Sequence, residues 1–429
     1  MKNIQLPIGW IAIAILTSAT LASAPRAMAQ QERVVYTFTD RIGGLGPQGG
    51  LVFDKAGNIY GVTSEGGQFR DGTVFKLTIN ANGGPVESVL HSFKPGGQDG
   101  LSPNGGLILD ASGNLYGTTY SGGNRPCTHY SGTHGCGTVY ELIPQPDGTW
   151  AEQVLHDFTG GGGDGTNPYA GLVFDAAGNL YGTTYYGGDT KECGKAGCGT
   201  VFELTPGADG TWQEKILLNF HPHAGTNPDA ALTLDASGNL YGTTLYGGTG
   251  FNGTVFELTP STSGEWNETV LHNFSSGPSD GATPESGVTF DGGGNLYGTT
   301  FLGGDAGYGI LYELTPSGGG IWTETVVHNF QPNLIDGAQP GPGALVFDSA
   351  GNLYGATGTG GTSFQGAVFE FTPSAAGGWT ESILHNFAPG PGGYYPSSSV
   401  ILDSAGNIYG TTGTYGGTNK SVYEIVRPK

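Results

Sequence analysis

The chain is organised by one short string of residues that recurs seven times. Asn-(Leu/Ile)-Tyr-Gly returns at intervals of 55 to 65 residues along almost the whole sequence. Each unit holds four strand-like runs, named here strands a, b, c and d, which in the third unit are residues 172–175, 179–184, 200–204 and 214–220. Four antiparallel strands in each of seven units predict an all-β fold, a seven-bladed β-propeller. The seven copies begin at Asn58, Asn114, Asn179, Asn239, Asn295, Asn352 and Asn407.

The turns between these strands explain an unusual composition. The 429 residues include 82 Gly and 25 Pro, a content close to that of disordered chains. Aromatic residues make up 11%, however, and disordered chains are poor in aromatics. Between strands a and b every unit carries Asp-x-x-Gly-Asn, in which the Asp can cap the turn and the Gly supplies a positive φ. Glycine is therefore interpreted as the turn residue of a folded repeat.

The phase of the repeat favours a closed ring over an open solenoid. The last unit ends after strand c (421–425), and no strand d follows it. Residues 32–38 match the missing strand, as a comparison with residues 324–330 shows. An open solenoid gives no reason to place a fourth strand at the opposite end of the chain. A ring does, because pairing the N-terminal strand with the last blade hides two sheet edges.

Residues 1–29 have the features of a secretory signal peptide. The apolar run from Ile8 to Ala22 is too short for a stable membrane span, and Ala27-Met28-Ala29 is a small-x-small cleavage site. We expect cleavage after Ala29, and a secreted or periplasmic protein with one propeller domain over residues 30–429. No second hydrophobic segment or sorting tail is found, so no membrane insertion is expected after cleavage.

The charge of the chain argues against a nucleic-acid partner. The formal net charge is −21, and the 15 basic residues are scattered. Most of the 36 Asp and Glu occupy repeat positions round the predicted ring, where their charge implies solubility. The Asp-x-x-Gly-Asn turn offers too few oxygen ligands for Ca²⁺. We expect a monomer without a cofactor.

The repeat resembles the GloVer-type tandem repeat family of secreted bacterial proteins across essentially the whole mature chain. The resemblance is carried by the seven Asn-(Leu/Ile)-Tyr-Gly-x-(Thr/Ser) segments, the Asp-x-x-Gly-Asn turns and the Gly-Thr-Val-Phe-Glu-Leu-Thr-Pro strands. It implies an exported propeller-like array, often with a C-terminal anchor, and no assigned chemistry; we expect no anchor here, which departs from that pattern. The Asp-x-x-Gly-Asn-(Leu/Ile)-Tyr element also looks like blades of NHL and gluconolactonase-like propellers, which supports the fold alone.

The four cysteines lie outside the repeat pattern. Cys127 and Cys136 fall in the b–c connection of the second unit, and Cys193 and Cys198 in that of the third. In an exported protein, two local disulfides are the favoured interpretation. The alternative is a zinc site formed by Cys127, His129, His134 and Cys136.

A histidine recurs at one place in strand d of five units. A histidine can serve as a metal ligand or as an acid–base group. Because each of these histidines belongs to a different blade, they cannot converge on one ion, and a structural role is expected. The five are His91, His156, His272, His328 and His385.

The b–c and d–a connections carry the aromatic residues that the repeat does not explain. In a propeller these connections share one face, and aromatics clustered on one face usually indicate recognition. Basic residues also collect there, on the first four units. We predict a surface that binds a polysaccharide or an extended peptide, with an anionic glycan compatible with the bases. The candidate ligand-binding residues are Arg70, Tyr120, Arg125, Tyr130, Tyr185, Tyr186, Lys191, His221, His223 and Tyr246.

Two other classes of function remain open. The first is a propeller hydrolase or lyase that acts on extracellular polysaccharide. The sequence has no Gly-x-Ser-x-Gly, no His-Glu-x-x-His and no acid pair that stands out from the repeat, so no catalytic residue is assigned. The second is a structural or partner-docking surface protein. The off-pattern candidates for chemistry are Asp189, Glu192, His221 and His223.

Overall fold

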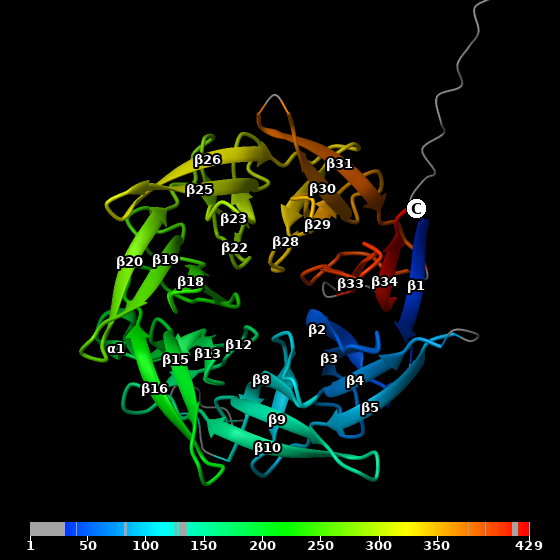
Figure 1. The fold of residues 1–429 in the computed structure, drawn as a ribbon, viewed down its shortest axis with the longest axis vertical. Helices are drawn as coiled ribbons and strands as arrows, with labels where there is room; N and C mark the ends of the chain where they lie inside the picture. Colours follow the sequence, from blue (N-terminus) through cyan, green and yellow to red (C-terminus); the bar gives the residue numbers. More distant parts are fainter. Residues whose placement is uncertain are drawn as a thin grey trace, which may run out of the picture.

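The described residues form a ring of seven blades. The computed structural model describes residues 31–39, 41–80, 84–124, 127, 135–375, 377–390, 392–413 and 419–428. Each blade is an antiparallel sheet whose strands run from the axis (a) to the rim (d), as Figure 1 shows. The prediction of a seven-bladed β-propeller with four strands per blade is confirmed. The expected signal peptide, residues 1–29, lies outside the described residues.

Strand a is the shortest strand in most blades, and short extra ladders extend some blades along the d–a connection. Blade 1 comprises β2 (Leu45–Phe53), β3 (Ile59–Glu65), β4 (Thr73–Thr78) and β5 (Val86–Ser92). Blade 2 comprises β6 (Gly100–Pro103), β7 (Ile108–Leu109), β8 (Leu115–Gly122), β9 (Thr138–Pro144) and β10 (Trp150–Asp157). Blade 3 comprises β12 (Val173–Phe174), β13 (Leu180–Thr184), β15 (Thr200–Pro206) and β16 (Trp212–Asn219), with the ladder of β11 (Gly165–Thr166) and β14 (Tyr186–Gly187).

The remaining blades follow the same order. Blade 4 comprises β17 (Thr233–Leu234), β18 (Leu240–Thr244), β19 (Thr254–Pro260) and β20 (Trp266–Asn273). Blade 5 comprises β22 (Thr289–Phe290), β23 (Leu296–Thr299), β25 (Ile310–Gly318) and β26 (Ile321–Asn329), with the ladder of β21 (Gly281–Ala282) and β24 (Leu302–Gly303). Blade 6 comprises β27 (Gly337–Pro340), β28 (Val346–Phe347), β29 (Leu353–Gly360), β30 (Ala367–Pro373) and β31 (Trp379–Asn386). Blade 7 comprises β32 (Ile401–Leu402), β33 (Ile408–Thr412), β34 (Lys420–Val426) and β1 (Gln31–Phe38).

Strand β1 completes the seventh sheet from the other end of the described chain. It pairs antiparallel with β34, in a register that runs from Gln31 opposite Val426 to Phe38 opposite Lys420. The pairing has a bulge between Val34 and Tyr36, and every other c–d pair has one at the equivalent place. Blade 7 therefore holds the two ends of the described chain in one sheet, side by side (Figure 1).

The a–b turn is held by its aspartate, as the sequence predicts. In blade 4, Oδ1 of Asp235 accepts the backbone N–H groups of Ser237 and Asn239, both at 2.8 Å, and Oδ2 accepts the Asn239 side chain at 2.9 Å. Gly238 has φ +84°, a left-handed conformation that favours glycine. The hydroxyl of Tyr241 in strand b donates to Glu257 of strand c at 2.7 Å. The repeat therefore satisfies its polar groups locally and leaves the sheet faces to apolar packing.

The core consists of apolar clusters between neighbouring blades. At the interface of blades 4 and 5, Tyr241, Val255 and Phe274 pack with Leu296 and Tyr312. Each fully buried side chain of this size contributes about 1.5–3 kcal/mol. A corresponding cluster joins blades 7 and 1. The described residues contain seven such clusters, so packing continues round the ring.

Two disulfides tie down the b–c connections of blades 2 and 3. Cys127 is bonded to Cys136 and Cys193 to Cys198, with Cα atoms 4.9 and 5.4 Å apart. The predicted disulfides are therefore present, and the alternative zinc site is wrong because the two sulfurs it needs are bonded to each other. Disulfides persist in oxidising compartments. Within the described part of the chain, no helix has the length and apolar character needed to cross a membrane.

Candidate functional site

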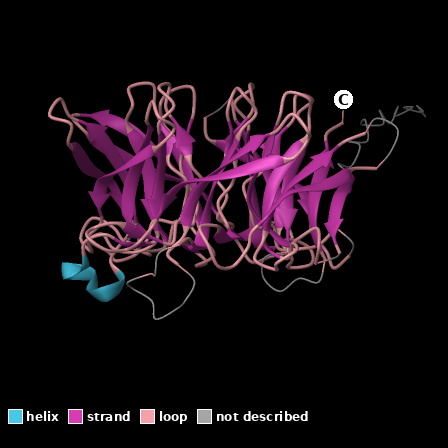
Figure 2. Cartoon of the chain, turned by 90° about the horizontal axis from the view of Figure 1, so that it is seen from below, coloured by secondary structure: helices cyan, strands magenta, loops and turns pink. Residues whose placement is uncertain are grey.

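The b–c and d–a connections lie together on one face of the disc. The short helix α1 (Thr190–Cys193) and the 3₁₀ turn η1 (Gly194–Ala196) belong to the b–c connection of blade 3 and project from this face (Figure 2). We call it the α1 face. The a–b and c–d turns lie on the opposite face.

A cavity of about 250 Å³ follows the ring axis and is lined by residues of all seven blades. Its wall is largely backbone, with glycines such as Gly49 and Gly106 at the closest approaches. The side chains that differ between blades come mainly from one position, the residue directly after the proline that precedes strand a. In the six units with regular proline spacing this residue is Gln48, Asn104, Tyr169, Asp229, Glu285 and Ser397.

A second cavity, of about 360 Å³, adjoins the first on the side of blades 2 to 5, and we call it the tyrosine cavity. Tyr120, Tyr169, Tyr185 and Tyr186 line it. Their rings form a chain of contacts, with centroids 6.0 Å apart for Tyr120 and Tyr169, 6.5 Å for Tyr169 and Tyr185, and 4.6 Å for Tyr185 and Tyr186. The remaining lining residues are Asn104, Asp229, Leu245, Glu285 and Pro342.

The structure gathers three of the predicted ligand-binding tyrosines, Tyr120, Tyr185 and Tyr186, in this cavity. Tyr246 lies near Tyr185 but is 47% exposed and does not line the cavity. Arg70 and Lys191 are exposed and also lie outside the lining. Two further candidates, Arg125 and Tyr130, and the alternative zinc ligands His129 and His134, fall outside the described residues.

Two carboxyl groups on the cavity wall were missed by sequence reasoning. Asp229 and Glu285 follow the repeat proline in blades 4 and 5, and both are half-buried. Burial raises the pKa of Glu285 to about 7. Burial, and then the charge of Glu285, raise the pKa of Asp229 well above its usual range, and Oδ1 of Asp229 is buried without a hydrogen-bond partner among the described residues. Sequence variation could have revealed them: the proline recurs in the repeat, whereas the residue directly after it differs from blade to blade.

The raised pKa of Glu285 predicts a pH-dependent stability. The folded state binds a proton up to about pH 7, whereas an unfolded chain releases it near the ordinary value of 4.5. The stabilisation is therefore complete below pH 4.5 and is lost as the pH rises through 7. Glu285→Gln should raise the free energy of unfolding at pH 8.5 by on the order of 2 kcal/mol and change it little at pH 4.

Urea denaturation at the two pH values measures this difference. Glu265→Gln, at an exposed c–d turn position, is the matched control and should leave both values unchanged. An equal effect of Glu285→Gln at both pH values would contradict the assignment.

The off-pattern candidates Asp189, Glu192, His221 and His223 also come together. They line a separate cavity of about 340 Å³ beside α1, with Asn219 and Phe220. All four side chains are exposed, and Oδ1 of Asp189 accepts the backbone N–H of Lys191 at 2.9 Å as the cap of α1. This arrangement explains Asp189 as a structural residue, and no catalytic geometry is evident among the four.

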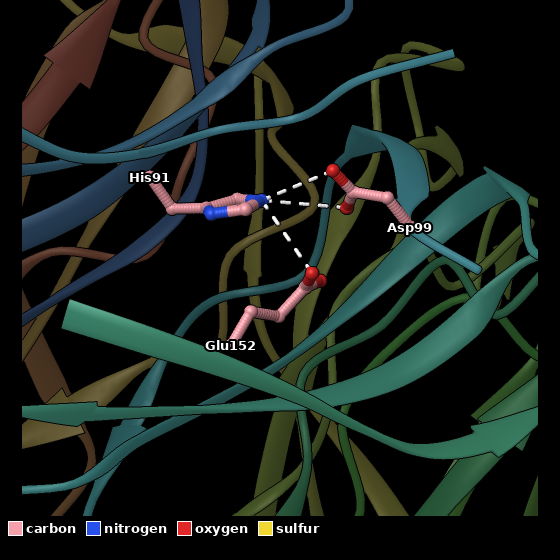
Figure 3. Close-up of side chains that lie close together, drawn as sticks. All are labelled: His91, Asp99 and Glu152. Atoms are coloured by element: carbon pink, nitrogen blue, oxygen red, sulfur yellow. Dashed lines mark hydrogen bonds and ion pairs between the residues drawn. The ribbon is translucent and has the colours of Figure 1, made fainter. Parts of the chain in front are cut away.

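The strand-d histidines require a correction. They do not meet one another, as expected, but His91 lies 3.3 Å from Asp99 of the following d–a connection and 3.8 Å from Glu152 of the next blade (Figure 3). Burial raises the pKa of Glu152 to about 8. The expectation that these glutamates serve mainly as surface charge is therefore wrong, because they are half-buried between blades. Four such groups occur among the described residues: His91, Asp99 and Glu152; His156, Asp164 and Glu214; His272, Asp280 and Glu324; and His328, Asp336 and Glu381.

Comparisons with known proteins agree with the repeat and with the fold. The profile of the Gloeobacter/Verrucomicrobia repeat family matches residues 26–192, 126–293 and 189–423. No curated protein matches the chain in sequence.

Solved structures are similar in fold only. An ancestral GH74 enzyme superposes with a TM-score of 0.55 at 12% identity, over 88% of this chain and 47% of that one. The chain thus spans about half of that structure. A structure described as a putative oxidoreductase (glucose dehydrogenase) from Thermus thermophilus has a TM-score of 0.43 at 16% identity, over 93% of this chain and 100% of that one.

Proposed function

We propose that this chain, which belongs to the Gloeobacter/Verrucomicrobia repeat family, is an exported binding module that holds a carbohydrate chain in the tyrosine cavity. The observation that carries the proposal is the convergence of four tyrosines and two carboxyl groups on one cavity at the axis. Export is supported by the two disulfides.

The chemistry of the cavity suits a sugar. Tyrosine rings offer flat apolar faces together with a polar hydroxyl, and sugar rings present C–H groups on one face and hydroxyls at the edge. Asp229 and Glu285 can exchange hydrogen bonds with those hydroxyls. Carboxyl groups line the cavity and the described basic side chains do not, so a neutral glycan fits it better than an anionic one.

Removal of two rings tests the proposal. A screen against bacterial and plant polysaccharides identifies the ligand, and the double variant Tyr185→Ala with Tyr186→Ala should then bind it at least about tenfold more weakly. The loss reflects roughly 1 kcal/mol for each stacked ring. Isothermal titration calorimetry measures the affinity.

The matched control changes aromatics that are exposed in b–c connections outside the cavity. Phe251 is 64% exposed and Phe364 is 51% exposed. Phe251→Ala with Phe364→Ala should leave the affinity unchanged. If the Tyr185 and Tyr186 double variant binds as tightly as the wild type, the cavity is not the site.

A second candidate function is glycoside hydrolysis, which the Asp229 and Glu285 pair favours. Glycosidases use two carboxyl groups, one that protonates the leaving oxygen and one that activates water or attacks the sugar. A carboxyl group with a raised pKa suits the acid role. Wild-type protein should then release new reducing ends from the bound polysaccharide, and Glu285→Gln should bind without cleaving. If the wild type releases no new reducing ends, hydrolysis is ruled out and binding is the remaining function.

A further inference from the structure

The four histidine–carboxylate clusters share one geometry. In each, the histidine comes from strand d of one blade, the aspartate from the d–a connection that follows it, and the glutamate from strand d of the next blade. Their potential ligand atoms, one imidazole nitrogen and two carboxylate oxygens, all lie within 4.8 Å of one another. We propose that these clusters are binding sites for a divalent first-row transition metal ion such as Zn²⁺, held between adjacent blades.

The spacing of the ligand atoms fits such an ion. Nε2 of the histidine lies 3.2–3.6 Å from the aspartate oxygen and 3.4–3.8 Å from the glutamate oxygen across the four clusters. Ligand atoms bound at about 2.0–2.2 Å in a tetrahedron are roughly 3.3–3.6 Å apart. The clusters are thus close to the spacing of three ligands round one metal ion, with a fourth position open to water.

The cluster of His156, Asp164 and Glu214 gives the strongest support. Nε2 of His156 and Oδ1 of Asp164 are buried, and neither has a hydrogen-bond partner among the described residues. Buried polar atoms normally have partners. All three residues line one cavity of about 540 Å³, which gives an ion a route to them. A bound cation would partner both of these atoms, which lie 3.6 Å apart as an ion pair.

Neighbouring groups hold the carboxylates in place by hydrogen bonds, as the groups around metal ligands commonly do. Oδ2 of Asp164 accepts the backbone N–H and the hydroxyl of Thr159, both at 2.7 Å, which leaves Oδ1 facing His156. In the third cluster, Asp280 is held in the same way by Ser275, at 2.7 and 2.6 Å. The backbone bulge of strand d lies directly before the histidine, and bulges commonly re-aim a side chain.

The set of ligand atoms indicates the class of metal. Ca²⁺ and Mg²⁺ take oxygen ligands and larger coordination numbers, whereas imidazole suits Zn²⁺ and related ions. One nitrogen, two oxygens and an open position therefore favour a transition metal. The ion would join strand d of one blade to strand d of the next and stabilise the ring in proportion to its occupancy.

The three other blade interfaces provide internal controls. Between blades 3 and 4, Leu218 and Ala224 take the places of histidine and aspartate, beside Glu268. Between blades 6 and 7, His385 pairs with Glu32 at 3.4 Å, but Gly392 replaces the aspartate. Between blades 7 and 1, the hydroxyl of Tyr36 donates to Glu87 at 2.7 Å. The fold thus tolerates loss of the cluster, so the wild type should bind four ions and not seven.

Zinc titration of untagged, chelator-treated protein tests the proposal. The wild type should bind four equivalents by calorimetry and by metal analysis after dialysis, and Zn²⁺ should raise its thermal midpoint. The double variant His156→Leu with Asp164→Ala copies the natural pair Leu218 and Ala224, and it should bind three equivalents. Glu214→Gln, which keeps the size of the side chain, should also bind three.

The control variant Asp189→Ala with His221→Ala removes exposed ligands beside α1 and should keep all four equivalents. Failure of the wild type to bind Zn²⁺ at micromolar concentration would overturn the proposal. The clusters would then be hydrogen-bonded ion pairs between blades and nothing more. Retention of four equivalents in both cluster variants would overturn it as well, because the ions would lie elsewhere.

Discussion

Deletion of residues 31–38 should lower the free energy of unfolding by at least about 4 kcal/mol and make the protein self-associate. Val35 and Phe38 are 3% and 4% exposed in the cluster between blades 7 and 1, and each contributes about 1.5–3 kcal/mol by burial. The deletion also leaves β34 as an unpaired edge strand, which favours pairing with another chain. Urea denaturation and size-exclusion chromatography measure the two effects.

Two controls separate the role of the strand from the role of its sequence position. Gln31→Ala changes an exposed residue at the start of β1 and should have no measurable effect. Moving residues 31–38 to the C-terminus, behind the c–d turn of blade 4 (261–265), would rebuild a continuous seventh blade, because Gln31 lies opposite Val426. This variant should regain most of the lost stability. A truncated protein that unfolds at the same urea concentration as the full chain would show that β1 does not close the ring.

Phe274→Ala should destabilise the protein by about 3–5 kcal/mol. Phe274 directly follows strand d of blade 4, is fully buried, and packs on Tyr312 of blade 5 with 5.2 Å between the ring centroids. Truncation removes a ring and leaves a cavity at a blade interface that the rigid sheets cannot close. The free energy of unfolding from urea denaturation measures the loss.

Phe251→Ala is the matched control, because it removes the same ring from an exposed position in the same blade. It should change the free energy of unfolding by less than about 0.5 kcal/mol. Equal effects of the two substitutions would mean that the blades are not held together by their buried aromatics.

The sequence predicts those parts of the molecule that depend on local chemistry. Each Asp-x-x-Gly-Asn turn is stabilised within five residues, as Asp235 and Asn239 show, so a repeat of the string repeats the structure. The disulfides are also local, since only nine residues separate Cys127 from Cys136 and five separate Cys193 from Cys198.

The groups that the sequence does not reveal depend on how one blade lies against the next. Glu152 follows His91 by 61 residues, and the two meet because strands d of neighbouring blades run side by side at the rim. Repeat alignment assigns each residue to its own blade and so hides a contact between different positions of different blades. Asp229 and Glu285 were hidden for another reason, since alignment treats the residue after the proline as unconstrained.

The residue after the repeat proline separates ligand binding from folding. The six positions from Gln48 to Ser397 point to a shared axis, while the turns, the apolar clusters and the disulfides are built from other residues. Ligand recognition and folding therefore depend on different residues of each unit. A library randomised at these six positions alone would sample new ligands on an unchanged scaffold, so the ring can serve as a frame for engineered receptors.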